Sequence, residues 1–326
     1  MDRRAFLATV GGVLLAAPLT ATAQPAGKVW RVGWLQPSPP ASAGHANFRQ
    51  AMRELGYVPG ENVAFEDRFA DGDFARLPGL ATELARSNLD VIVAVAPGAI
   101  RAARNATRTI PIVMAFSGVD PVKAGFVASL NRPGGNVTGI TMLAPELSAK
   151  PLDVLKQALP AARRVGVLGY RTNPGTDEQL KAVESAAARA GITVQAIYVQ
   201  KPERYDDLFA PLGQQRIDAI LVLSDTVLSN DRARIAQSAM RHRLPAVFDF
   251  KESAEAGGIV SYGVNNLGLY RQAARFVDRL FKGAKPADLP VEQPTTFELV
   301  INLKTARALG LSIPPSLLLR ADHVIE

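Results

Sequence analysis

The sequence contains no cysteine, and this absence removes several kinds of chemistry. The chain cannot form disulfides, bind a metal through thiolates, use a cysteine nucleophile or carry a lipid anchor on a leader cysteine. Histidine is also scarce, because His45, His242 and His323 are the three present, and they lack the spacing of metal ligands. We therefore expect no metal site and no cofactor.

The motifs of common enzyme classes are missing as well. There is no G-x-S-x-G elbow, no P-loop and no G-x-G-x-x-G after a predicted strand. His242 lies between Arg241 and Arg243 on a polar helical face, which favours a solvated side chain over a general base. The sequence therefore predicts a binding protein rather than an enzyme, and an exported hydrolase remains the less favoured alternative.

Positive charge exceeds negative charge, but it is not clustered. The formal net charge is +7, and outside the first residues no run of Lys and Arg exceeds residues 163–164. Scattered charges are typical of a solvated surface rather than of a nucleic-acid interface. We expect no nucleic-acid partner, and we expect a monomer.

The first residues have the pattern of a signal peptide. Arg3 and Arg4 give a basic start, residues 5–19 are apolar, and residues 21–23 form an A-x-A cleavage site. We expect residues 1–23 to be removed by cleavage after Ala23, with export by the Sec or the twin-arginine route. No later stretch is long and apolar enough to cross a bilayer, so the pattern predicts a periplasmic protein.

The remaining sequence repeats itself at a nearly constant offset. Residues 31–35 (R-V-G-W-L) are echoed by residues 164–168 (R-V-G-V-L), and residues 110–116 by residues 244–250. Residues 55–56 and 89–95 have counterparts at 190–191 and 217–223. Matches in register at a long period indicate an internal structural duplication.

Each half of the duplication alternates apolar strand-like runs with amphipathic helical runs. This order predicts an α/β fold of two doubly wound parallel-sheet lobes joined by a hinge. We expect lobe I to comprise residues 26–141 and 265–295. Lobe II and the hinge are predicted to comprise residues 142–263 and 296–326.

In such sheets ligands bind beyond the carboxyl ends of the strands, so the residues there are candidate ligand contacts. The candidates are Ser38, Ala96, Pro97, Ser117, Asp120, Tyr170, Thr172, Asn173, Asp225, Asp249 and Tyr262. Free amides at helix starts could hold a carboxylate, and Asp225 or Asp249 could hold an ammonium. The set predicts a small polar ligand with a negative and a positive end, and amino acids, including aromatic ones, are candidates.

Several of these residues have a purely structural alternative. Asp225 could cap the helix that begins at Thr226. Asp120 could fix a loop or a helix start, and Thr172 and Asn173 could belong to a turn before Pro174. Between the two acids of the second half we favour Asp225 slightly, because it leads directly into a helix.

Three stretches together resemble a known family. They are residues 110–139, with I-P-I-V-M, V-D-P and N-R-P-G-G-N-V-T-G; residues 285–292, K-P-A-D-L-P-V-E; and residues 302–322. They resemble the ABC transporter substrate-binding protein family that contains the TrpX-type proteins, which bind tryptophan or tyrosine. The resemblance covers nearly all of the chain after the leader. It implies a type I periplasmic-binding fold whose lobes close around a ligand and deliver it to a membrane permease.

Carried over by position, the resemblance implies ligand contacts at matching strand ends. These are Ala96, Pro97, Ser117, Thr172, Asn173, Asp225 and Asp249. Family members often have a hydroxyl residue after the third strand, where this chain has Ala96-Pro97-Gly98. A binding subunit that serves a sensor rather than an importer is the alternative function that the sequence leaves open.

Overall fold

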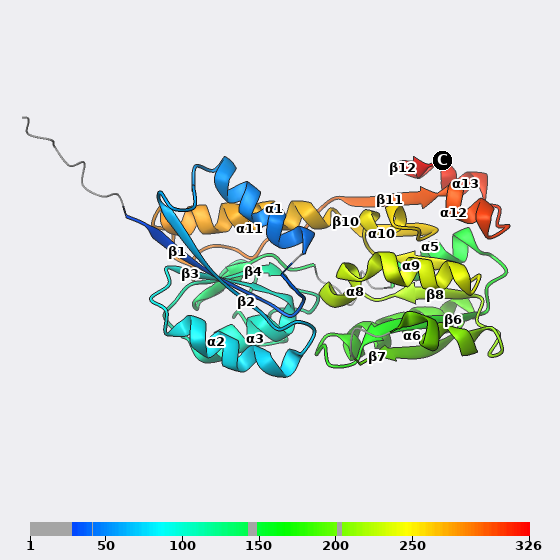
Figure 1. Cartoon of the computed structure of the whole chain (residues 1–326), viewed down its shortest axis with the longest axis horizontal. Coiled ribbons are helices and arrows are strands. Elements are labelled where there is room, and N and C mark those ends of the chain that lie inside the picture. Colours follow the sequence, from blue (N-terminus) through cyan, green and yellow to red (C-terminus); the bar gives the residue numbers. More distant parts are fainter. Residues whose placement is uncertain (1–27, 41, 143–148, 201–203) are drawn as a thin grey trace, which may run out of the picture.

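The protein consists of two α/β lobes that lie side by side along its long axis (Figure 1). The structure is a computed structural model and describes residues 28–40, 42–142, 149–200 and 204–326. The predicted signal peptide lies outside these residues. Each lobe is built on a sheet of mainly parallel strands, which confirms the predicted fold class.

The first lobe contains a five-stranded parallel sheet with the order β2-β1-β3-β4-β5. Its strands are β1 (Trp30–Gln36), β2 (Val63–Phe69), β3 (Val91–Val95), β4 (Ile112–Phe116) and β5 (Val137–Gly139). Its helices are α1 (Ala43–Glu54), η1 (Phe74–Arg76), α2 (Leu77–Ala85), α3 (Ala96–Ala106) and α11 (Asn266–Phe281). Helices α1 and α11 pack together, and so do α2 and α3, which leaves every residue of β3 and β4 buried.

The second lobe contains a seven-stranded sheet with the order β12-β11-β10-β9-β8-β6-β7. Its strands are β6 (Arg164–Tyr170), β7 (Thr193–Val199), β8 (Ala219–Val222), β9 (Ala246–Phe248), β10 (Val260–Val264), β11 (Phe297–Asn302) and β12 (His323–Ile325). Its helices are α5 (Lys150–Ala158), α6 (Thr176–Ala190), α7 (Tyr205–Phe209), η2 (Ala210–Leu212), α8 (Thr226–Asn230), α9 (Arg232–Arg241), α10 (Lys251–Glu255), α12 (Leu303–Ala308) and α13 (Pro315–Leu318). Only the β10–β11 pairing is antiparallel among these strands.

The two lobes repeat the same topology. The order β7-β6-β8-β9-β10 of the second sheet reproduces the order β2-β1-β3-β4-β5 of the first. Gly33 and Gly166 occupy equivalent positions in the first strand of each lobe, and their surroundings explain why both strands have glycine there. A Cβ at Gly33 would lie 2.5 Å from the Leu89 side chain, and one at Gly166 would lie 2.7 Å from the Ile197 side chain. A Cβ at either position would force these apolar side chains to move, so glycine suits both strands, where a side chain packs directly on the backbone.

The chain passes between the lobes at several points along its length. It leaves the first lobe after β5, returns between β10 and α11, and leaves again before β11, which lies in the second lobe (Figure 1). Two of these segments pair with each other, because the Thr141 amide donates to the Glu292 carbonyl and the Glu292 amide to the Gly139 carbonyl, at 3.0 and 2.9 Å. Gly139 has φ +125°, and a Cβ there would lie 2.4 Å from the Met114 carbonyl oxygen, so this position requires glycine.

No helix within the described part of the chain is long and apolar enough to cross a membrane.

Candidate ligand-binding site

A small cavity lies between the two lobes, and we call it the cleft cavity. Its volume is about 40 Å³. The first lobe contributes Ser38, Ser42, Ala43, Gly44, Phe116, Asn266, Leu267 and Tyr270, and the second lobe contributes Thr226, Ser229, Asn230, Arg232, Phe250, Glu252 and Ser253. Most of these residues follow strands or begin helices, so the cavity lies where an α/β sheet is expected to bind a ligand.

Several oxygen atoms around the cleft cavity are buried without a hydrogen bond. They are both carboxylate oxygens of Glu252, the side-chain oxygen of Asn266 and the hydroxyl of Thr226, and none has a partner among the described residues. A buried acceptor without a donor costs free energy, more so when it is charged. A ligand that brings several N–H donors into the cavity would remove this cost.

Glu252 lies in the first turn of α10 and is the acidic residue of the cleft cavity. Burial raises the pKa of its carboxyl, and the nearby charge of Glu255 adds to the rise, while a contact with its own backbone amide and the charges of Lys251 and Arg232 oppose it. A cation bound against the carboxylate would replace the lost hydration and favour the charged form.

The opposite lobe brings the start of α1 to the same cavity. Ser42 caps this helix by accepting the His45 amide at 3.3 Å, and Ala43 and Gly44 follow in the first turn. The first amides of a helix have no partner within the helix and attract negative charge. Gly44 is needed here, because a Cβ would lie 2.3 Å from the ring of Tyr270 on α11.

A second cavity of about 40 Å³ lies in the second lobe, and we call it the inner cavity. It adjoins the carboxyl ends of β8, β9 and β10. Its walls are largely apolar and are formed by Met142, Pro151, Leu221, Val222, Leu223, Phe250, Tyr262, Gly263, Val264 and Phe297, together with the polar residues Gln179, Ser224 and Asp249. Phe250 lines both cavities.

Asp249 is the acid of the inner cavity. One of its carboxylate oxygens is buried and has no hydrogen-bond partner among the described residues. Burial raises the pKa of Asp249 to about 7; contacts with the Ser224 hydroxyl and its own backbone amide oppose this rise, and the charges of Glu252 and Asp225 add to it. This carboxyl is therefore poised to change its charge near neutral pH.

Asp225, the acid that we favoured from the sequence, caps α8 instead of lining either cavity. One carboxylate oxygen accepts the amides of Val227 and Leu228, at 2.6 and 3.0 Å. The other accepts the side-chain amide of Asn173 at 2.5 Å. Because both oxygens already have protein partners, the structure favours the capping alternative for Asp225 and a supporting role for Asn173.

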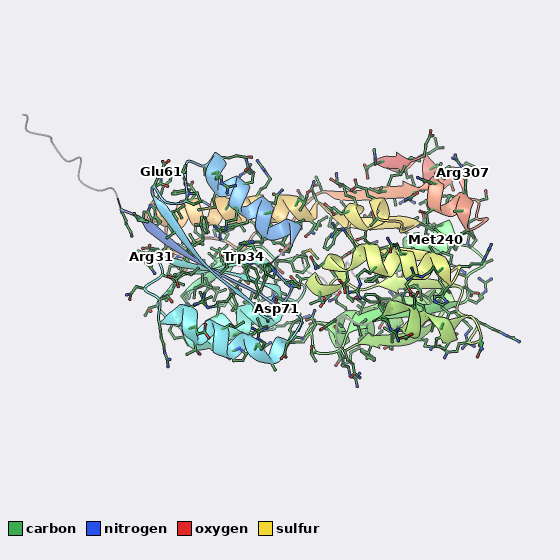
Figure 2. The ribbon with its side chains drawn as sticks, viewed as in Figure 1. Arg31, Trp34, Glu61, Asp71, Met240 and Arg307 are labelled. Atoms are coloured by element: carbon green, nitrogen blue, oxygen red, sulfur yellow. The ribbon has the colours of Figure 1, made fainter. Side chains whose placement is uncertain are left out.

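Tyr170 connects the lobes. Its hydroxyl donates to the carbonyl of Gly72 in the first lobe at 2.8 Å, and its ring centre lies 5.6 Å from that of Phe74. Figure 2 shows Asp71, the residue before Gly72, on the side of the first lobe that faces the second lobe. Tyr170 is fully buried, so it acts at the interface between the lobes rather than as an exposed aromatic surface for a ligand.

The remaining candidates are divided among several places. Ser38 lines the cleft cavity, and Tyr262 lines the inner cavity. Ser117 donates to the Val119 carbonyl, and Asp120 accepts the amides of Val122 and Lys123, as in a loop cap. Ala96 and Pro97 begin α3 and Thr172 is exposed beside α2 and α3, and none of these three lines either cavity.

Sequence reasoning missed Glu252, Asn266 and Thr226. Glu252 is three residues beyond Asp249, one helical turn past the strand end at which the candidate list stopped. The candidates were taken from the residues that directly follow the carboxyl ends of strands. Including the first turn of the helix after each strand would have added Glu252 and Thr226. Asn266 begins a helix of the first lobe that comes late in the chain, and no local signal linked it to the cavity.

Comparison with known proteins agrees with this architecture. The profile of the "ABC transporter substrate binding protein" family matches residues 39–325. A tyrosine-binding protein of Clostridioides difficile is 26% identical over 265 residues, which cover 81% of this chain and 75% of that protein.

Solved structures show the same relationship. An ABC domain from Streptococcus pneumoniae in complex with L-Trp superposes with a TM-score of 0.81 at 26% identity, covering 91% of this chain and 100% of that one. A conserved domain protein from Vibrio cholerae has a TM-score of 0.81 at 27% identity, covering 92% and 99%. Members of the matching family bind small ligands and work with ABC permeases. The chain belongs to the ABC transporter substrate-binding protein family.

Proposed function

We propose that this protein is the periplasmic receptor of an ABC importer and that it captures an α-amino acid in the cleft cavity. The observation that carries the proposal is the Glu252 carboxylate, which lines an interlobe cavity with both oxygens buried and without a hydrogen-bond partner among the described residues. The start of α1 lies on the other side of the same cavity.

The two sides of the cleft cavity complement the two charged ends of an amino acid. An ammonium group has three N–H donors, and Glu252, Asn266 and Thr226 offer unused oxygens to receive them. A carboxylate would be favoured on the first-lobe side at the first amides of α1, where the helix dipole is positive. The names of two relatives, a tyrosine-binding protein and a domain bound to L-Trp, support this ligand class.

The ligand acts by stabilising the closed arrangement of the lobes. Tyr170 already bonds Gly72 across the lobes, and the rings of Phe116 and Phe250 meet edge to face at 6.1 Å. A ligand that contacts both lobes binds the closed form more tightly than the open form and so shifts the population toward it. We propose that the crossing segments near Thr141, Val264 and Glu292 form the hinge, and that a monomer in its closed form delivers the unchanged ligand to the permease.

Replacement of Glu252 tests the proposal. Glu252→Gln keeps the size of the side chain and removes its charge, so it should weaken amino-acid binding by about tenfold to a hundredfold, on the scale of a charged hydrogen bond. Glu184→Gln, on the exposed face of α6 in the same lobe, is the matched control and should leave the affinity unchanged. Isothermal titration of the purified protein with a panel of amino acids measures both, and equal affinities in the two variants would contradict the proposed site.

A further inference from the structure

The first lobe carries an excess of positive charge around α3 and the loop that follows β4. Residues 91–141 contain one acidic residue, Asp120, and five basic residues. These form no continuous run in the sequence, but the fold brings them to one side of the lobe, beside α2 (Figure 1). We call this surface the basic face, and its basic residues are Arg101, Arg104, Arg108, Lys123 and Arg132.

The arginines of α3 face the loop of residues 121–136. Arg101 and Arg104 are three residues apart, so they are neighbours on the helix surface, and Arg108 follows just beyond the helix end. The guanidinium of Arg101 lies 5.4 Å from the ring centre of Phe126 in this loop. Arg104 and Arg108 line a surface hollow of about 390 Å³ together with residues 125–128 and 133–136, and Arg132 directly precedes the second of these segments.

The arginines of the basic face are not neutralised by the protein. Among the described residues, none of the four forms an ion pair, whereas Arg31, Arg49 and Arg68 of the same lobe each bind a carboxylate. The single acid, Asp120, lies 3.9 Å from Lys123. The adjoining turn of residues 285–288 carries one Lys and one Asp and adds no net charge. The face therefore presents its charge to an anion outside the protein.

The basic face is broad, and it includes an exposed apolar side chain. The seven residue steps from Arg101 to Arg108 span about 10 Å at the rise of a helix, which is wider than a single phosphate ion. Val122 is 40% exposed, and its carbonyl accepts the amide of Gly125, which lines the same hollow, at 3.0 Å. Basic side chains around an exposed apolar one are typical of surfaces that bind the headgroup region of a bilayer.

We infer that the basic face binds the anionic surface of a lipid bilayer, with its guanidinium groups on the headgroup phosphates. The inference goes beyond the proposed function, because these residues line neither the cleft cavity nor the inner cavity. Binding there would keep the receptor close to the membrane that contains its permease. Each basic residue near an anionic surface strengthens binding about fivefold, so several together give a measurable affinity.

Cosedimentation with lipid vesicles tests the inference, using the protein purified from the periplasm. The vesicles are phosphatidylcholine alone or an equal mixture of phosphatidylcholine and phosphatidylglycerol. At low ionic strength the wild type should bind only the anionic vesicles, and about 1 M NaCl, which shortens the screening length to about 3 Å, should abolish binding. The triple variant Arg104→Gln, Arg108→Gln, Arg132→Gln should lower the affinity about a hundredfold.

A second triple variant controls for the loss of net charge. Lys181→Gln, Arg189→Gln and Lys304→Gln remove the same charge from exposed positions on α6 and α12 of the second lobe. This variant should bind anionic vesicles within about threefold of the wild type, because its charges lie away from the proposed contact. Should the first triple variant fail to fold by circular dichroism, Arg108→Gln with Arg132→Gln, both at exposed positions, must lower the affinity about thirtyfold.

Several results would overturn the inference. Equal binding to both kinds of vesicle, or to neither, excludes recognition of an anionic membrane, and equal losses in the two triple variants show that only net charge matters. Displacement of the vesicles by inorganic phosphate at constant ionic strength would indicate a site for a single anion. If the wild type binds poly-L-glutamate but not the vesicles, the face suits an acidic protein instead. Amino-acid binding in the cleft cavity is measured separately, so none of these results bears on the proposed function.

Discussion

Replacing Asp249 by asparagine should make the ligand-free protein more stable at alkaline pH. The Asp249 carboxyl lies in the largely apolar inner cavity, and one of its oxygens has no hydrogen-bond partner among the described residues. Burial disfavours its charged form and raises the pKa to about 7. Asparagine has nearly the same shape as the neutral carboxyl but cannot ionise, so Asp249→Asn removes the cost of burying the charge.

The direction and size of the effect follow from proton linkage. Between pH 3.8 and about 7 the folded protein retains the Asp249 proton while the unfolded chain releases it, so folding stability falls as pH rises through this window. Each tenfold difference in proton affinity is worth about 1.4 kcal/mol. A rise from 3.8 to about 7 therefore sets a ceiling of about 4 kcal/mol on the stability lost by pH 8.

Urea unfolding followed by circular dichroism at pH 4, 6 and 8 measures this effect. Asp249→Asn should match the wild type at pH 4 and exceed its free energy of unfolding by up to about 4 kcal/mol at pH 8. Asp71→Asn is the control for the loss of one carboxylate, because Asp71 is exposed and its φ of 54° is a conformation that asparagine tolerates. If the difference between wild type and Asp249→Asn is the same at every pH, the argument from burial is wrong.

Three further predictions concern the lobe interface, the cap of α8 and the leader. Tyr170→Phe removes the hydrogen bond to Gly72 and should weaken ligand binding by about threefold to tenfold, which corresponds to the free energy of one hydrogen bond. The radius of gyration in solution scattering should increase. If affinity and radius are both unchanged, Tyr170 does not hold the lobes together. Asp225→Ala should lower the free energy of unfolding by about 2–4 kcal/mol, because α8 loses its cap and Asn173 loses a buried hydrogen-bond partner. The folded variant should keep its ligand affinity. A loss of affinity at unchanged stability would instead indicate that Asp225 contacts the ligand. Mass spectrometry of the exported protein should give a chain that begins at Gln24, and a full-length product would contradict cleavage after Ala23.

Much of the fold could be predicted from the sequence because its signals are local. The buried strands read as apolar runs such as residues 91–95, and the helices between them require a parallel sheet. The duplication was visible because both lobes have similar residues at equivalent points, including Gly33 and Gly166, where an apolar side chain packs on the strand. The strand-end rule also led to Ser38, Asp249 and Tyr262, which line the cavities.

Tertiary structure decided which polar groups remain available to a ligand. Asp225 and Glu252 both follow a strand of the second lobe, and the sequence does not distinguish them. The carboxylate of Asp225 accepts hydrogen bonds from Val227, Leu228 and Asn173. The two carboxylate oxygens of Glu252 have no hydrogen-bond partner in the described part of the chain, and Glu252 lines a cavity with residues of the other lobe.

The contacts between lobes could not be predicted for the same reason. Tyr170 and Gly72 are far apart in the sequence, and so are Phe250 and Phe116, yet each pair meets across the two lobes. The sequence by itself determined the core of each lobe, because most of its strands and helices are neighbours along the chain, with α11 as the exception in the first lobe. The candidate site depends on how the lobes pack against each other, because that packing decides which buried oxygens of the described residues line the cleft cavity without a hydrogen-bond partner.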